Sequence, residues 1–142
     1  MASGVYNNWK AKVMTGRYNM GSGGDTIKVA LMNNSHGFTA THDVWADVSA
    51  NEISGTGYTS PGQNLGSQTV SIDDTDNEGV FDAADTAWTT ATFTAYHAVI
   101  YDDTVATPAD DLICSIDFGG AKTVTAGTFT IQWAAEGIIN LT

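Results

Sequence analysis

The sequence predicts an all-β fold: an antiparallel β-sandwich of seven or eight short strands with a short amphipathic helix at the N-terminus. Residues 87–101, 112–118 and 128–133 show the alternating or continuous apolar pattern of strands. Glycine and Asp/Asn clusters separate these runs at short intervals. Only 15% of the 142 residues are charged, a composition typical of turn-rich β proteins. Both a jelly-roll and an immunoglobulin-like topology fit this spacing.

Two runs, 87–101 and 112–118, are predicted to form an antiparallel pair at the centre of a sheet. Both are apolar on two faces, and such strands are usually covered on both sides. Period-2 alternation groups one set of side chains of the first run on a single face: Ala91, Phe93, Ala95, His97, Val99 and Tyr101. In the second run the same rule groups Leu112, Cys114, Ile116 and Phe118. Cys114 is therefore expected to be a small buried hydrophobic residue.

The chain is expected to have two parts, an N-terminal helix or arm with a Gly-rich linker (residues 1–24) and a β-sandwich domain (residues 25–142). Val5, Trp9 and Val13 recur at helical spacing, which predicts an amphipathic helix over about residues 4–15. The linker is the Gly-Ser-Gly-Gly stretch at 21–24. Further strands are predicted over 25–32, 68–72, 79–81, 128–133 and 138–141, with helical turns over 42–48 and a long loop over 51–64.

Composition argues against several classes of protein. There is no run of 18 apolar residues, so a membrane-spanning helix and a membrane partner are not expected. The first ten residues have no signal-peptide core, so synthesis in a cytoplasm is expected. The single cysteine excludes an intramolecular disulfide.

Charge is unevenly spread along the chain, whose net charge is −11. Residues 1–28 hold Lys10, Lys12, Arg17 and Lys28 against Asp25 alone, a net charge of +3, whereas the other 114 residues hold Lys122 against 15 acids, a net charge of −14. An acidic body disfavours nucleic-acid binding, because phosphate contacts need a basic face. The basic segment is either the polar side of an ordinary first helix or an arm that docks on an acidic surface, such as a neighbouring copy. Candidate partner-binding residues there are Trp9, Lys10, Lys12 and Arg17.

An acidic run resembles the start of a calcium loop. Asp74, Asp76 and Glu78 alternate and are followed by Gly79, which is the pattern that a hard cation needs, and Asp82 and Asp85 follow at later positions. The run departs from that pattern in two places, at Glu78 and at the closing Asp85. A solvated acidic hairpin turn explains the same residues, so calcium is a candidate cofactor and no other cofactor is expected.

Catalysis is not expected. His36, His42 and His97 lack metal-like companions, and there is no Gly-x-Ser-x-Gly nucleophile elbow. Among the aromatic residues, Trp9, Trp45 and Trp133 fit apolar stripes, which indicates core packing. Tyr58 and Trp88 are the two candidates for an exposed partner- or sugar-binding contact.

Several phrases resemble small structural proteins of tailed bacteriophages. They are Asp25–Met32 (DTIKVALM), Asp47–Tyr58 (DVSANEISGTGY), Asp117–Gly120 (DFGG) and Gly127–Trp133 (GTFTIQW), and the likeness covers most of residues 5–142. The resemblance implies a β-sandwich used in many copies on the virion and carries over no catalytic residue. We therefore expect a capsid decoration or cement protein, made in the host cytoplasm, that binds the major capsid protein or other virion proteins as a homo-oligomer, with a trimer favoured. The alternatives are a tail, neck or fibre-base component, or a carbohydrate- or receptor-binding module.

Overall fold

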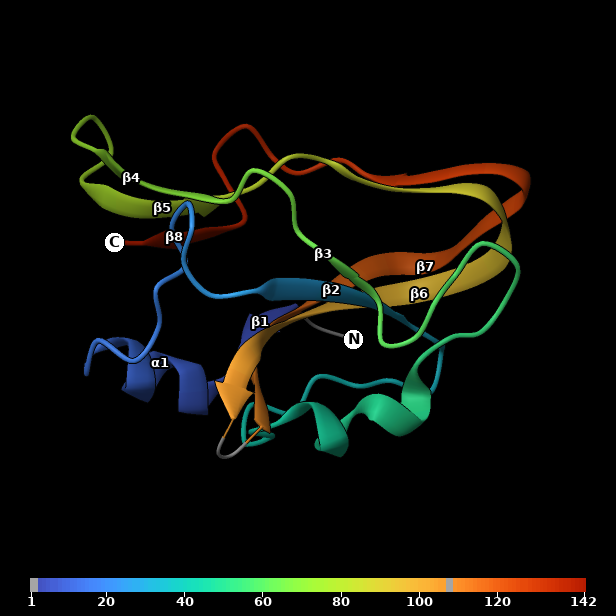
Figure 1. The fold of residues 1–142 in the computed structure, drawn as a ribbon, viewed down its shortest axis with the longest axis horizontal. Helices are drawn as coiled ribbons and strands as arrows, with labels where there is room; N and C mark the ends of the chain where they lie inside the picture. The colour runs from blue at the N-terminus through green and yellow to red at the C-terminus, as the bar shows by residue number, and fades with distance from the viewer. Residues whose placement is uncertain (1–2, 107–108) are drawn as a thin grey trace.

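A computed structural model describes residues 3–106 and 109–142 and shows two antiparallel sheets with one short α-helix (Figure 1). The five-stranded sheet has the order β1-β7-β6-β2-β3 and the three-stranded sheet the order β4-β5-β8. The elements in chain order are β1 (Gly4–Val5), α1 (Asn7–Val13), β2 (Ile27–Met32), the 3-10 turns η1 (Trp45–Asp47) and η2 (Ser49–Asn51), β3 (Gln63–Asn64), β4 (Thr69–Asp73), β5 (Glu78–Asp82), β6 (Thr86–Ala106), β7 (Ala109–Ile131) and β8 (Ile139–Leu141). The predicted all-β sandwich with a short N-terminal helix is confirmed. In the described part of the chain, no helix has the length and apolar character needed to cross a membrane.

The five-stranded sheet is covered on both faces. On one side lies the three-stranded sheet, and the core between them includes Ile27, Val29, Leu31, Phe81, Ile100 and Ile139. On the other side lies the segment of residues 33–51, which contains η1 and η2, and the core there includes Ala30, Met32, Val48, Val99, Tyr101 and Leu112. Every residue of β2 except Lys28 is buried, because the alternate side chains of this strand serve different cores.

The long β6–β7 pair links the layers. Figure 1 shows this pair running from the top layer round a bend and back through the lower sheet. The two strands are 21 and 23 residues long, so the prediction that all strands are short is wrong for them. β7 also merges the predicted runs 112–118 and 128–133 into one strand. Gly119 and Gly120, which suggested a break, keep positive φ values of 74° and 141° inside the strand.

A register shift in the β6–β7 pair changes which face the residues of β6 occupy. The register slips between Ala95 and His97, and after this slip Ala98 and Ile100, not Val99 and Tyr101, share a core with the residues before it. Ala95 pairs with Lys122 and His97 with Asp117, so β7 has three more residues than β6 at this point, and the later side chains of β6 move to the opposite face. The predicted single face from Ala91 to Tyr101 is therefore wrong beyond Ala95.

A similar slip in β7 lies at Ile113. Ile100 pairs with Cys114 and Tyr101 with Leu112, which leaves Ile113 as the extra residue. As a result Leu112 faces one core while Cys114 faces the other. Cys114 is buried as predicted, and this burial raises the pKa of its thiol to about 12.

The N-terminal segment is part of the same fold. Gly4 and Val5 are extended and pair with Ser115 and Cys114 of β7, so the helix begins only at Asn7 and is shorter than the predicted 4–15. Trp9 and Met20 belong to the core between the sheets. Trp9 and Met20 of the segment that the sequence sets apart as an arm thus share a hydrophobic core with residues of the two sheets.

The loop between η2 and β4 approaches the large sheet closely at a glycine. Gly62 has φ +83°, and a β-carbon built there would overlap the Val29 carbonyl oxygen and lie 2.8 Å from Ala30 Cα. Gly66, four residues on, is exposed and has open space around the same position. Only the first glycine is therefore required by the backbone path.

We predict that Gly62→Ala lowers the free energy of unfolding by at least about 2 kcal/mol, because the methyl group clashes with β2 and the left-handed backbone is strained. Gly66→Ala should change the free energy of unfolding by less than about 1 kcal/mol. Urea titration of both variants measures the difference. Equal stability of the two variants would contradict the close approach.

Candidate functional site

Helix α1 sets its basic side chain on a buried acid of its own chain. Lys12 Nζ lies 2.9 Å from both carboxylate oxygens of Asp111, whose side chain is fully buried. The Tyr18 hydroxyl donates to Asp111 Oδ2 at 2.9 Å and Asn8 Nδ2 to Oδ1 at 3.4 Å. Burial and the adjacent carboxylate raise the pKa of Tyr18, so its phenol stays protonated and donates. Lys12, a predicted partner-binding residue, is thus committed to an internal ion pair.

The other predicted contact residues divide by exposure. Lys10 and Arg17 are exposed on and after α1. Trp9 and Trp88 are 2% and 5% exposed, so both belong to the core and neither presents a ring to a partner. Trp88 packs against Phe93 and Phe129 with ring centroids 6.5 and 5.9 Å apart.

Tyr58, the remaining aromatic candidate, is half-buried and fixes the 51–64 loop. Its hydroxyl donates to Glu52 Oε1 at 2.6 Å and accepts from the Leu31 backbone N–H at 3.0 Å. Ser60 Oγ donates to the second oxygen of the same carboxylate at 2.6 Å. Burial and the bond to Glu52 raise the pKa of Tyr58. The hydroxyl groups of Tyr58 and Ser60 and the Glu52 carboxylate are therefore engaged with one another and, through Tyr58, with β2.

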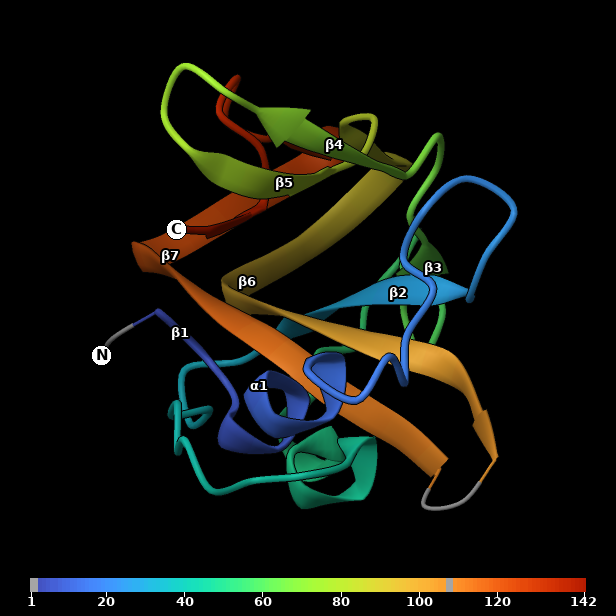
Figure 2. The same ribbon diagram turned by 90° about the vertical axis from the view of Figure 1, so that its left-hand side faces the viewer.

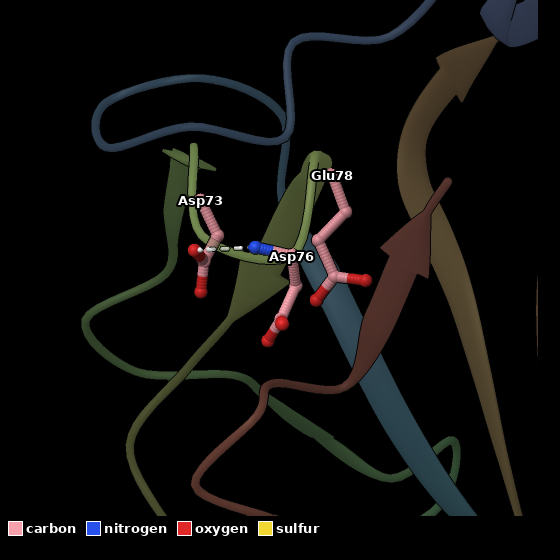
Figure 3. A group of neighbouring side chains, drawn as sticks. All are labelled: Asp73, Asp76 and Glu78. Carbon is pink, nitrogen blue, oxygen red and sulfur yellow. Dashed lines mark hydrogen bonds between the residues drawn. The ribbon is translucent and has the colours of Figure 1, made fainter.

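The acidic turn between β4 and β5 brings together three carboxylates (Figure 3). One ligand oxygen from each of Asp73, Asp76 and Glu78 lies within 4.8 Å of the others. Asp73 stands where the sequence suggested Asp74, which is outside this group. Asp73 Oδ1 also accepts the backbone N–H groups of Thr75 and Asp76, at 2.8 and 3.2 Å. This is the arrangement of an acidic turn, and the calcium site stays a prediction from the sequence.

A buried polar cluster joins residues that the sequence left apart. His36 Nε2 lies 2.9 Å from Ser115 Oγ, and the His36 ring meets the His97 ring edge-on at 5.2 Å. His97 Nδ1 in turn lies 3.7 Å from Asp117 Oδ1. His36 and Ser115 are 1% and 2% exposed, so a substrate cannot reach the hydroxyl in this structure. Burial, together with the neighbouring histidines, lowers the pKa of His36 to about 4, so its ring is neutral at pH 7.

An apolar groove of about 170 Å³ lies between α1 and the three-stranded sheet. We call it the end groove; its lining includes Trp9, Val13, Tyr18, Met20, Val70, Phe81, Ile139 and Leu141. Val70 and Leu141 in its lining are 59% and 50% exposed. Ile72, two residues after Val70 in β4, is 81% exposed, and Met14, which follows the lining residue Val13, is 82% exposed. In the sequence, only the alternation of Val70 and Ile72 with polar residues indicates this groove. The residues on its α1 side lie about 50 or more positions away along the chain, so no local pattern connects them with Val70.

Comparison of the chain with protein-family models, with curated proteins and with solved structures found no match.

We predict that Lys12→Met lowers the free energy of unfolding by about 3 kcal/mol, because it leaves the Asp111 carboxylate buried without its cation. Lys10→Met is the matched control, since Lys10 is exposed on the same helix; it should change stability by no more than about 0.5 kcal/mol. Lys12→Met/Asp111→Asn should recover part of the loss, because neither charge remains. Equal unfolding midpoints for the two single variants would contradict the internal role of Lys12.

We also predict a pH dependence of stability that depends on His36. The unfolded ring takes up a proton near pH 6.5 and the folded ring near pH 4, so the unfolded state binds more protons between these values. The free energy of unfolding should fall by about 3 kcal/mol as pH drops from 6.5 to 4 through this residue. Asp102 acts in the opposite direction, because burial raises its pKa to about 6.

The difference between wild type and His36→Gln isolates the histidine from Asp102. Glutamine keeps an amide that can bond to Ser115 Oγ but does not titrate. Urea unfolding from pH 7 to pH 4 should show a smaller loss of stability in the variant. A parallel pair of curves would contradict a neutral buried His36.

Proposed function

We propose that this chain is a structural protein of a tailed-bacteriophage virion, of the capsid decoration or cement kind, and that it works by binding protein surfaces. The observation that carries the proposal is the end groove with two exposed apolar side chains in its lining, Val70 and Leu141, and two more, Met14 and Ile72, within two residues of the lining along the chain. A small protein keeps such a group of side chains in water only at a cost to solubility, and it commonly marks a site where another protein binds. The phage-like phrases of the sequence supply the identity of the assembly.

Charge supports a place on the outside of the particle. The body of the chain from residue 29 onward has a net charge of −14. Packaged DNA repels such a body, whereas the outer face of a capsid lattice presents protein. A compact sandwich with an uncovered apolar end suits a subunit that sits on that lattice and stabilises it.

The predicted sugar-contact residues are buried or hydrogen-bonded within the fold, which gives the carbohydrate- or receptor-binding alternative less support. Trp88 is buried, and the Tyr58 hydroxyl is already bonded to Glu52 and to the Leu31 backbone N–H. A tail, neck or fibre-base component would also bind other virion proteins, and it differs from a decoration protein in its copy number.

Quantitative mass spectrometry of purified particles tests the proposal. A decoration role predicts hundreds of copies per virion, and particles that lack the chain should release their DNA at a lower temperature than complete particles. A few or a dozen copies would move the assignment to the tail or fibre base. Absence from purified particles would overturn a virion role.

A further inference from the structure

The core-facing side of the three-stranded sheet extends past the part that the rest of the fold covers, and its exposed apolar side chains lie there. Val70 pairs with Phe81, and Ile72 and Leu141 both pair with Gly79, so these side chains project from one face. Phe81 is buried in the core, whereas Val70, Ile72 and Leu141 lie past the cover that α1 provides. A β-carbon added at Gly79 would meet nothing within 4 Å, so a notch remains open between Ile72 and Leu141.

Charges of opposite sign lie on the elements at the two sides of this groove. On the α1 side, Lys10 and Arg17 are exposed and make no ion pair within the described residues. On the other side, the β4–β5 turn that follows Ile72 carries Asp73, Asp74, Asp76 and Glu78. Figure 2 looks onto this end, with α1 below and the β4–β5 hairpin above. An apolar strip therefore lies between a basic border and an acidic one.

Such a strip is self-complementary. When a second copy is turned by 180° about an axis through the groove, its basic border faces the acidic border of the first copy, and its acidic border faces the basic one. The apolar strips then cover each other. A two-fold contact uses the same patch on both subunits, so one patch of this kind is sufficient.

We propose that two copies of this chain pair through the end groove about a two-fold axis, with Lys10 and Arg17 of each copy against the β4–β5 turn of the other. Burial of Met14, Val70, Ile72 and Leu141 supplies the favourable free energy, and the charges set the orientation. The trimer expected from the sequence would require two different patches on each subunit. The pairing rests on the proposed structural role, since both begin from the same uncovered side chains.

A charge exchange tests the pairing in solution with the purified chain. Variant A is Lys10→Glu/Arg17→Glu and variant B is Asp74→Lys/Asp76→Lys, both at exposed positions. Variant A alone places like charges across both halves of the contact, so its dimer dissociation constant should rise at least about 10-fold, equivalent to about 1.4 kcal/mol. Variant B alone leaves the β4–β5 turn with no net charge, because Asp73 and Glu78 remain, so its dissociation constant should also rise. A mixture of A and B places the lysines introduced in B opposite the glutamates introduced in A in one half of the contact, keeps the wild-type pairing in the other half, and should restore the dimer. Sedimentation velocity over a concentration series measures the masses.

Matched variants separate this contact from net charge and from folding. Lys122→Glu and Asp43→Lys change exposed charges elsewhere on the chain and should leave the dissociation constant near that of wild type. Met14→Ser and Ile72→Ser remove exposed apolar groups without touching the core, so they should weaken the dimer and keep the unfolding midpoint.

The outcomes distinguish a second copy of this chain from a capsid protein as the partner that binds the groove. A wild-type chain that stays monomeric or forms trimers overturns the two-fold pairing, as does an A and B mixture that stays monomeric. A monomer present in hundreds of copies per virion would assign the groove to a capsid protein and leave the proposed function standing. A dimer absent from purified particles would overturn the proposed function and leave the pairing standing.

Discussion

One pair of strands has to face two hydrophobic cores at once, and most of this structure follows from that constraint. β6 and β7 form the middle of the large sheet and bend back into the other layer. A continuous two-fold alternation would send each set of side chains to one side along the whole length. The slips at Ala95–His97 and at Ile113 reassign the faces, so that each core receives apolar groups from both strands.

A second constraint is electrostatic. Asp111 is fully buried at the start of the long β7 strand, and the cost of that burial is offset by Lys12, Tyr18 and Asn8 from the N-terminal segment. The uneven distribution of charge along the sequence is thus explained in part by the ion pair between Lys12 and Asp111. Lys12 completes the fold, whereas Lys10 and Arg17 remain at the surface. α1 is held to the body by hydrophobic contact through Trp9 and by this ion pair.

The sequence predicted what depends on local pattern: the β class, the helix around Trp9, the central position of the 87–118 pair and the burial of Cys114. It did not predict what depends on register, because a one-residue bulge leaves composition unchanged while it moves side chains to the other face. The candidate site was harder still. Trp88 and Trp9 are core residues, and the end groove exists only because β4, β8 and α1, distant in sequence, lie together.

The single cysteine makes the larger core observable by chemistry. Cys114 lies in the core between the sheets, and burial raises the pKa of its thiol to about 12, so the reactive thiolate is scarce in the folded chain at neutral pH. A reagent can alkylate the Cys114 thiol only when β7 separates from the strands beside it. The rate at which a thiol reagent labels Cys114 therefore measures how often the fold opens.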